Sequence, residues 1–283
     1  MCVTGQLSRL EVMTKIQFVV KPNHRAGALI DVGFVLDVHS NYSTNLGVEL
    51  FKPDQAALVA HFQNSGANVV FFDARNQTED PFISPTYVQR LDNTFRSIEF
   101  QRRRAANHFR QFEAISRCNS QVAVADYDVY VRLRDDALFV ANMNLTQPWL
   151  PGIHVPRCNA WTGINDRGAI IVGRAHADAY FRLLFHHFVN FDAIPPEGRS
   201  TIRNPESFLA YVMRAGNVPI HIDCNFSMPF VSSRREKGSP CVTNIDLGEV
   251  SHSSPYENCE NRPLGPGVRC IATDLPRCKQ QKM

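Results

Sequence analysis

The sequence lacks several features that would place it quickly in a functional class. No apolar stretch approaches the length of a membrane-spanning helix, and the first residues lack the basic-then-apolar layout of a signal peptide. The formal net charge is only +3, so the composition does not indicate a general nucleic-acid binder. There is no Walker-type loop, no serine nucleophile elbow and no Gly-x-Gly-x-x-Gly after the first expected strand. These absences disfavour the commonest kinases, hydrolases and dehydrogenases.

The eight cysteines form no Cys-x-x-Cys pair, which argues against a zinc module. Five of them lie in the last quarter of the chain, at Cys224, Cys241, Cys259, Cys270 and Cys278. Cross-links would stabilise such a loop-rich region, and they persist in oxidising compartments. Four Asn-x-Ser/Thr sequons point weakly the same way. Localisation is therefore unknown, with a slight preference for the secretory pathway or the Golgi lumen. The chain begins inside an expected strand, so we expect either that it starts abruptly or that an upstream segment with a targeting signal has been lost.

Apolar runs separated by helix-length segments predict an α/β domain with a mostly parallel sheet. The runs from Leu29 to Asp37 and from Asn68 to Asp73 have the length of buried strands, and each ends in an acidic residue. A shorter strand is expected at Cys2 to Gly5, and helical spacing of apolar residues predicts a helix between Ile98 and Cys118. This alternation is typical of a parallel sheet covered by helices.

The second half of the chain completes the expected domain. We expect a strand at Gly168 to Gly173, an apolar helix at Ala175 to Phe191 and an edge strand at Val218 to Ile222. Asn204-Pro205-Glu206 has the residues of a capped helix start. Beyond Phe230, Pro, Gly, Ser and Cys replace apolar residues. We therefore expect one domain over residues 1–228 and an irregular tail over residues 229–283, packed on the domain or extending from it.

The expected strand from Tyr127 to Asp136 carries unusual charge for a central strand. Side chains alternate across a sheet, so Val129, Val131 and Leu133 share one face while Tyr130, Arg132, Arg134 and Asp136 share the other. Two arginines and a carboxylate are costly to bury unless they pair with one another or meet a ligand. Ligands of open parallel sheets bind at the carboxyl ends of the strands, where Asp135 and Asp136 fall.

Two interpretations of this strand end stay open. Carboxylates at that position suit a divalent cation that carries a diphosphate, and nearby arginine would offset the charge of a leaving diphosphate. Alternatively, the charges form an internal salt-bridge ladder that simply ends the strand. Spacing alone favours neither.

Several segments resemble those of a known group of proteins. The stretch from Tyr127 to Asp136 resembles the Y-D-x-x-x-R-x-R-x-D strand of GT-A-type glycosyltransferase-like proteins from algae, protists and bacteria. Cys2 to Arg9 resembles their first strand and nucleotide-side turn, and Trp161 to Arg167 resembles their W-x-G-I-N-D-R segment. With Asn204-Pro205-Glu206, the matches keep the family's order from near residue 1 to about residue 225. Asp135 departs from the pattern, which often has Pro there, and this leaves open which Asp would face a metal.

The resemblance implies a single GT-A-like, Rossmann-like domain that moves a hexosyl or related sugar from a nucleotide-sugar donor to a glycan or another hydroxyl acceptor. It implies Mn²⁺ or Mg²⁺ as cofactor, held by Asp136 with Asp135. Gly5 and Arg9 would lie beside the nucleotide, because Gly5 permits close backbone approach and Arg9 can reach a phosphate. Arg132 and Arg134 would brace the site.

The remaining candidate residues have structural explanations beside the functional ones. Trp161 and Asn165 could bind a sugar, although loop caps use Asn as readily. Asp166 and Glu206 are the candidates for the base that deprotonates the acceptor hydroxyl, although Glu206 also suits a first helical turn. His221 could supply a late metal ligand, although such a histidine is more often a satisfied rim residue.

Two other functions fit the same pattern. One is a binding protein on this fold whose donor site no longer turns over, and the other is a nucleotidyltransferase that consumes a nucleoside triphosphate. An active enzyme should lose metal-dependent donor binding on Asp136→Ala, whereas a scaffold should lose only stability. The fold alone does not decide, because one sheet hosts many chemistries.

Overall fold

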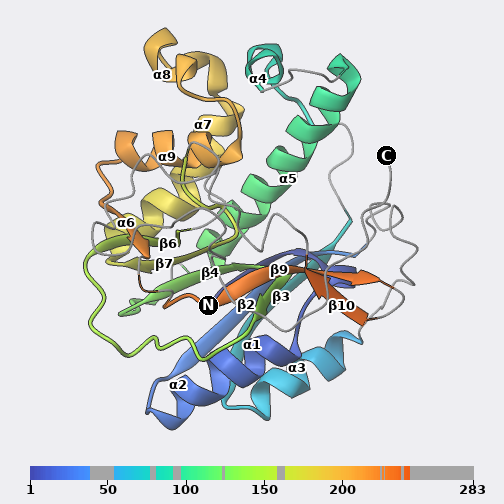
Figure 1. Ribbon diagram of the computed structural model, residues 1–283, viewed down its shortest axis with the longest axis vertical. Coiled ribbons are helices and arrows are strands. Elements are labelled where there is room, and N and C mark those ends of the chain that lie inside the picture. Colours follow the sequence, from blue (N-terminus) through green and yellow to red (C-terminus); the bar gives the residue numbers. More distant parts are fainter. Residues whose placement is uncertain are drawn as a thin grey trace, which may run out of the picture.

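A central sheet of seven strands organises the protein (Figure 1). The computed structural model describes residues 1–38, 54–76, 81–91, 97–122, 125–157, 163–223, 225, 227–236 and 239–242. The strands are β1 (Cys2–Gln6), β2 (Ile30–Asp37), β3 (Ala67–Arg75), β4 (Tyr130–Arg134), β6 (Gly152–Pro156), β7 (Gly168–Val172) and β8 (Ile220–Asp223). They lie in the order β3-β2-β1-β4-β7-β6-β8.

The sheet is mostly parallel, as the sequence predicts. β1 pairs in parallel with β2 and with β4, and β2 pairs in parallel with β3. Only β7 runs the other way, since it is antiparallel to both β4 and β6, while β8 is parallel to β6. The chain builds β2 and β3 on one side of β1 and then crosses to β4 on the other. This change of direction is the switch point at which Rossmann-like sheets open a ligand crevice.

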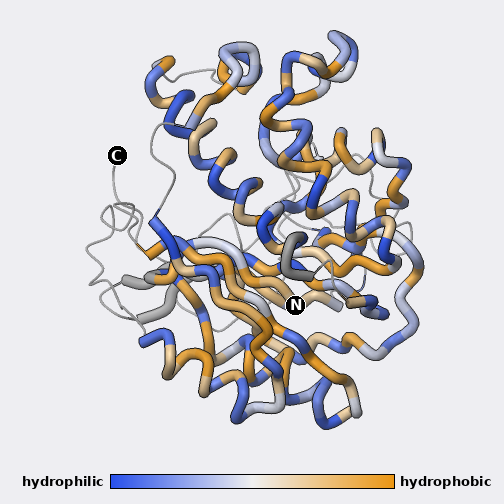
Figure 2. The backbone as a smooth tube through the Cα atoms, turned by 180° about the vertical axis from the view of Figure 1, so that it is seen from behind, coloured by the Kyte–Doolittle hydropathy of each residue, from blue (hydrophilic) through white to orange (hydrophobic). Residues whose placement is uncertain are grey.

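Helices cover both faces of the sheet (Figure 1). One face carries α1 (Met13–Lys15), η2 (Ile16–Val20) and α2 (Lys21–Arg25), which run on from one another, and α3 (Gln55–Gln63). The other face carries α4 (Pro85–Arg90), α5 (Ile98–Val122), α6 (Arg174–Asp178), η4 (Ala179–Leu183), α7 (Leu184–Val189), η5 (Phe191–Ala193), α8 (Pro196–Ser200) and α9 (Pro205–Ala215). The inner strands are therefore mostly buried on both sides, whereas the edge strand β3 is largely half-buried or exposed, and Figure 2 shows the strands as largely hydrophobic.

The long helix α5 lies beside β1 and β2. Its apolar stripe, at the helical spacing that predicts this element, includes the buried Ala105, Phe112 and Ile115, and Phe112 packs on aromatic rings of α7 and α9. A disulfide joins Cys2 at the start of β1 to Cys118 near the end of α5. The sequence did not predict this pairing. Of the five late cysteines, Cys224, Cys259, Cys270 and Cys278 lie outside the described residues.

A second, smaller sheet begins directly after the Asp135-Asp136 pair. It consists of β5 (Ala137–Phe139), β9 (Phe230–Glu236) and β10 (Ser239–Val242), in the antiparallel order β10-β9-β5. The expectation of irregular chain from residue 229 is thus wrong for residues 230–236 and 239–242, because Phe230 and Val231 are buried and pair with Phe139 and Leu138 of β5. Residues 243–283 lie outside the described part.

The remaining expected elements are found close to their predicted positions. The edge strand expected at Val218–Ile222 is β8, which lies at one edge of the large sheet, and the short 3-10 helix η1 (Leu7–Arg9) follows β1. Along the described ranges, no helix combines the length and the hydropathy needed to cross a membrane.

Candidate functional site

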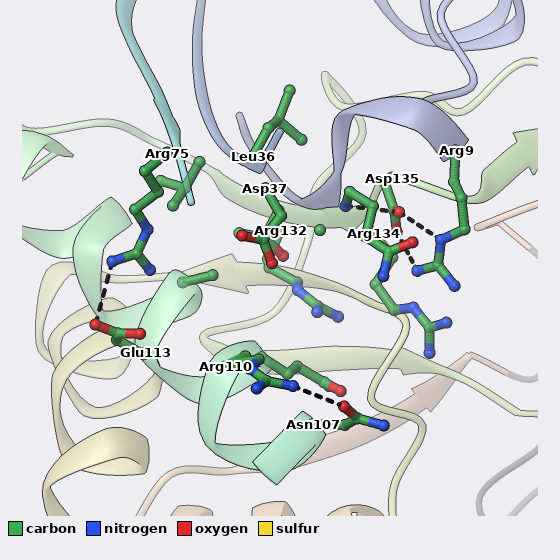
Figure 3. A pocket seen from close by; sticks show the side chains of 16 residues that line it. Arg9, Leu36, Asp37, Arg75, Asn107, Arg110, Glu113, Arg132, Arg134 and Asp135 are labelled. Atoms are coloured by element: carbon green, nitrogen blue, oxygen red, sulfur yellow. Dashed lines mark hydrogen bonds and ion pairs between the residues drawn. The ribbon is translucent and has the colours of Figure 1, made fainter. Parts of the chain in front are cut away.

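A cavity of about 280 Å³ opens where β1, β2, β3 and β4 end, against the side of α5 (Figure 3). Thr4, Gly5 and Gln6 come from β1, Asp37 ends β2 and Arg75 ends β3. Helix α5 closes the other side with Asn107, Arg110, Gln111, Glu113 and Ala114. The cavity therefore lies at the switch point of the sheet, where a Rossmann-like fold places its ligand.

Positive charge dominates the lining of this cavity. Five arginines, namely Arg9, Arg75, Arg110, Arg132 and Arg134, face three acidic residues, Asp37, Glu113 and Asp135. Two ion pairs bridge the wall, from Arg75 to Glu113 at 3.1 Å and from Arg9 to Asp135 at 2.9 Å. The surplus of guanidinium groups suits an anionic ligand.

The alternation of β4 places two of these arginines on the cavity side of the sheet. Arg132 is opposite Cys2 and Arg134 is opposite Thr4 in the β1–β4 register. In Figure 3 both side chains extend from β4 towards α5, where Arg110 and Asn107 lie. Leu133 and Val131 point to the other face and join an apolar core. The predicted division of this strand into a polar and an apolar face is confirmed.

Arg132 is completely buried, with an exposed fraction of 0%. Its Nη1 donates to the carbonyl oxygen of Asp166. The buried hydroxyl of Tyr180, from η4, lies beside the same guanidinium and interacts with it electrostatically and through a side-chain hydrogen bond. These contacts hold the cation inside the fold, where burial lowers its pKa.

Arg134 links two carboxylates. Its Nη2 donates to Asp136 Oδ2 at 2.8 Å, and its Nη1 lies 3.9 Å from Asp166 Oδ1. Burial opposes the charge of Arg134, but Asp136, Asp166 and Asp135 outweigh burial and raise its pKa. The guanidinium is therefore held in its charged form at the cavity wall.

Asp135 acts as a brace between β1 and the end of β4. Its carboxylate accepts hydrogen bonds from the Gln6 amide at 2.8 Å, from Arg9 Nε at 2.9 Å and from Arg9 Nη2 at 3.1 Å. The buried ammonium of Lys15 donates to its carbonyl oxygen at 2.9 Å. Gly5 has a φ of +138°, and a Cβ there would collide with the Asp135 carboxyl group. Gly5 and Arg9, expected beside a nucleotide, do line the cavity, and they also hold Asp135 in place.

The loop before β7 brings Asp166 to the same site. Gln111 Nε2 of α5 donates to Asp166 Oδ2 at 2.7 Å. The Asn165 side chain accepts from the Arg167 amide at 2.8 Å, which is the loop-bracing role weighed against sugar binding. Sequence reasoning missed Gln111, Arg75, Arg110 and Tyr180. Of these, only Arg75 had a local signal, because it follows a strand expected to end at Asp73.

Glu206 lies in the first turn of α9, next to that loop. The Asn204 side chain caps this helix by accepting from the Ser207 amide at 2.7 Å, as the sequence predicts. The Ile164 amide donates to the Glu206 carbonyl oxygen at 3.2 Å. Gly163 packs so closely that a Cβ there would collide with the Glu206 backbone. The two candidate bases, Asp166 and Glu206, are thus brought within each other's electrostatic influence.

The pKa values of these two carboxyl groups are displaced in opposite directions. Burial and then the Asp166 charge raise the pKa of Glu206 to about 8. Burial also acts to raise the pKa of Asp166, but Arg134, the Gln111 hydrogen bond and Arg132 outweigh it and lower that pKa. A pair separated in this way provides one group that stays ionised and one that can exchange a proton near neutral pH.

Two predicted site residues are not part of this arrangement. His221 lies on β8, separated from β4 by β7 and β6, where its ring stacks on His154 at a centroid distance of 4.6 Å. Its Nε2 lies 3.0 Å from the Pro151 carbonyl oxygen. The structure therefore does not bring His221 to Asp135 and Asp136. The expectation that His221 is a third metal ligand there is wrong, because its ring contacts other residues of the sheet. Trp161 lies outside the described residues.

The carboxylates expected to hold Mn²⁺ or Mg²⁺ are engaged by amide and guanidinium groups in this arrangement. Both oxygens of Asp135 accept hydrogen bonds from Gln6 or Arg9, and Asp136 is paired with Arg134. Within the described residues, no group of three or more His, Cys, Asp or Glu side chains is arranged to hold a metal ion. The predicted salt-bridge ladder at the end of the strand is what these contacts form.

A scan against models of protein families found none that matches this chain, and a search of curated proteins found no similar sequence. The fold, the arginine-lined cavity and the neighbouring carboxyl pair are therefore the basis on which a function can be argued.

Proposed function

We propose that this protein transfers a sugar from a nucleoside-diphosphate donor to a hydroxyl acceptor, with the donor in the cavity at the ends of β1–β4. The observation that carries the proposal is an arginine-lined cavity at the switch point of a Rossmann-like sheet, next to the Asp166–Glu206 pair. The ordered sequence matches to GT-A-type glycosyltransferase-like proteins support the same class of reaction.

The arginines suit the diphosphate of such a donor. Guanidinium groups bind phosphate oxygens in a two-pronged geometry, and they stabilise the negative charge that grows on a departing diphosphate. Arg132 and Arg134 from β4 and Arg110 from α5 all line the cavity. Charge stabilisation at this position lowers the barrier to breaking the bond between the sugar and the diphosphate.

Glu206 is assigned as the group that takes the proton of the acceptor. The acceptor oxygen forms a bond to the anomeric carbon, its proton passes to the Glu206 carboxylate, and the bond to the diphosphate breaks with its electron pair leaving on the diphosphate. A pKa of about 8 suits a base that works near neutral pH. Asp166 stays ionised beside Arg134 and orients the positive side chains.

Binding and turnover test the proposal. The protein is titrated with UDP, GDP, ADP, CDP and their sugar conjugates while the melting temperature and the release of nucleoside diphosphate are measured. A donor at a hundredfold excess over its Kd stabilises the folded state by about 2.7 kcal/mol, which corresponds to a shift of roughly 5 °C or more. Glu206→Gln should keep donor binding and lose turnover, while the exposed control Glu197→Gln on α8 should retain both.

Other outcomes separate the alternatives. Consumption of a nucleoside triphosphate with release of pyrophosphate would identify a nucleotidyltransferase. Donor binding without turnover, at any acceptor tried, would identify a binding protein. The proposal fails if no nucleotide in the panel shifts the melting temperature.

A further inference from the structure

We infer that Asn107 and Gln111 of α5 form a subsite for the hydroxyl groups of a sugar ring, on the helix wall of the cavity. Gln111 accepts a hydrogen bond from one hydroxyl, and Asn107 donates a hydrogen bond to a neighbouring one. That the ring belongs to a nucleotide sugar rests on the proposed function, whereas the recognition of hydroxyl groups rests on the two amide side chains.

The two amides are placed so that one ligand can contact both. They lie one helical turn apart on α5, and both residues line the cavity. Residues four apart on a helix are neighbours, with about 5–6 Å between their Cβ atoms. Both residues are half-buried, and Figure 3 shows Asn107 at the cavity beside Arg110. A ligand in the cavity therefore reaches both side chains without entering the core.

The contact with Asp166 fixes which atom of the Gln111 amide is left for a ligand. Gln111 Nε2 donates to Asp166 Oδ2 at 2.7 Å. Burial acts to raise the pKa of Asp166, but Arg134 and this hydrogen bond outweigh it and lower that pKa, so the carboxylate is ionised and only accepts. The amide nitrogen must therefore face Asp166. Because Gln111 lines the cavity and Asp166 does not, the oxygen Oε1 remains as an acceptor for the ligand.

The contact with Arg110 fixes the Asn107 amide in the opposite sense. Arg110 Nη1 donates to Asn107 Oδ1 at 3.3 Å. A guanidinium group only donates hydrogen bonds, so the amide oxygen of Asn107 must face it. The nitrogen Nδ2 then remains as a donor for the ligand. Successive turns of α5 thus present one acceptor and one donor to the cavity.

This combination of an acceptor and a donor is complementary to hydroxyl groups. Ionised phosphate oxygens only accept, so they satisfy Asn107 and leave Gln111 Oε1 without a partner. A hydroxyl both donates and accepts, so two neighbouring hydroxyls of a ribose or a pyranose satisfy both amides. The α5 wall therefore distinguishes the sugar part of a ligand from its phosphates. The ring is either the ribose of the nucleotide or the transferred sugar, and the experiment below separates the two.

Calorimetric titration with deoxy ligands tests the inference on the unaltered protein. The ligands are UDP, GDP, ADP, CDP, their glucose conjugates and the four free nucleosides, each intact and with one ribose or glucose hydroxyl removed. Loss of a recognised hydroxyl should raise the Kd by about fivefold to a hundredfold, the effect of leaving a polar group unpaired. A loss with the deoxyribose forms identifies the ribose, and a loss with the deoxyglucose forms identifies the transferred sugar.

Two variants assign that preference to α5. Gln111→Met keeps the length of the side chain and removes the acceptor, so the preference for the hydroxylated ligand should shrink to within about twofold. Asn107→Leu should do the same for the neighbouring hydroxyl. The matched control Gln63→Met, at an exposed position of α3, should keep the full preference. A purely structural role of Gln111 would weaken binding of both ligand forms equally and leave the preference unchanged.

The possible failures are distinguishable. Nucleoside diphosphates and their conjugates that bind equally well with and without each hydroxyl overturn the inference and leave the proposed function standing. A preference that survives in both variants overturns its assignment to α5. Binding of free nucleosides with this preference, but of no diphosphate, supports the subsite and overturns the proposed function. No binding of any ligand overturns both proposals. The comparison of intact with deoxy ligands needs no variant, so it decides the outcome even if Gln111→Met does not fold.

Discussion

Gly5 and Asp135 show how two residues set the wall of the cavity. Gly5 adopts a φ of +138°, which side chains rarely tolerate, and the space of its missing Cβ is filled by the Asp135 carboxyl group. That carboxylate in turn binds the Gln6 amide and Arg9. The brace needs a glycine and an acid at these positions, whether or not a ligand is present.

Gly5→Ala should therefore destabilise the protein strongly. Backbone strain and overpacking together are expected to lower the free energy of unfolding by about 2–4 kcal/mol, measured by urea denaturation. The matched control is Gly27→Ala, which has a φ of +88° but no atom within 4 Å of the added Cβ. The control should lose only about 1 kcal/mol. Equal losses in the two variants would mean that Asp135 does not press on Gly5.

His108 makes the folded state sensitive to acid. It is buried on α5, where its Nδ1 lies 2.9 Å from the Tyr87 hydroxyl, and burial lowers its pKa from 6.5 to about 3. Because the pKa of His108 is lower in the folded state, the unfolded chain binds a proton at this residue below pH 6.5 and the folded chain does not. The corresponding stability is present above that pH and is lost progressively as the pH falls towards 3.

His108→Gln should remove this part of the acid sensitivity, since its amide stays neutral and can still contact Tyr87. Between about pH 7 and about pH 5, the loss of unfolding free energy should be smaller in the variant than in the wild type by about 2 kcal/mol. Urea denaturation at both pH values measures the difference. Parallel pH profiles of the two proteins would show that His108 is protonated in the folded state.

At the scale of elements, the disulfide between Cys2 and Cys118 fastens β1 to α5 on either side of the cavity. The bond closes a loop with a sequence separation of 116 residues. Cross-links over long loops stabilise proteins chiefly by restricting the unfolded chain. The bond also holds α5 over the face of β4 that carries Arg132 and Arg134.

Cys2→Ala, Cys118→Ala and the double variant should each lower the unfolding free energy by about 2–4 kcal/mol relative to the oxidised protein. The costs should not add, because either single change already removes the bond. Urea denaturation of all four proteins completes the cycle. Single-variant costs that add up in the double variant would show that the two residues act independently and are not bonded.

At the scale of the whole molecule, the site exists only because distant segments converge. Arg9 follows β1, Arg132 and Arg134 lie on β4, Gln111 lies on α5, and Glu206 lies in the first turn of α9. The carboxyl pair responds to all of them, since Arg134, Gln111 and Arg132 lower the pKa of Asp166 while burial and Asp166 raise the pKa of Glu206. The protonation behaviour of the site is therefore a property of the assembled fold.

If Glu206 is the base, the transfer rate should rise with pH and level off above about 8, where its carboxyl group is ionised. Asp166, with its lowered pKa, stays ionised across this range and therefore adds no second pH-dependent step to the rate profile. Glu206→Gln should lower kcat by about a hundredfold or more and remove the rise with pH. Steady-state kinetics from about pH 6 to about pH 9 check this, with Glu197→Gln as control. A rise that persists in Glu206→Gln would assign the base elsewhere.

Much of the fold was predictable because its signals are local. The apolar runs of β2 and β3, the stripe of α5 and the cap at Asn204 each depend on neighbours within a few residues. The alternation of β4 likewise predicted that Arg132 and Arg134 share one face. Local signals failed after residue 229, where β9 forms because β5 offers an edge to pair with.

The sequence by itself determined which residues are charged, which face of β4 they occupy and that the strand ends at a crevice. Only the tertiary structure decided which groups these charged side chains contact. The carboxylates of Asp135 and Asp136 are suitable both for a metal ion and for an ion pair, and the choice depends on whether the fold brings arginine to them. Strand register and helix packing determine these long-range contacts. They bring Arg9 to Asp135 and Gln111 to Asp166, and they place His221 beside His154 and away from the carboxylates.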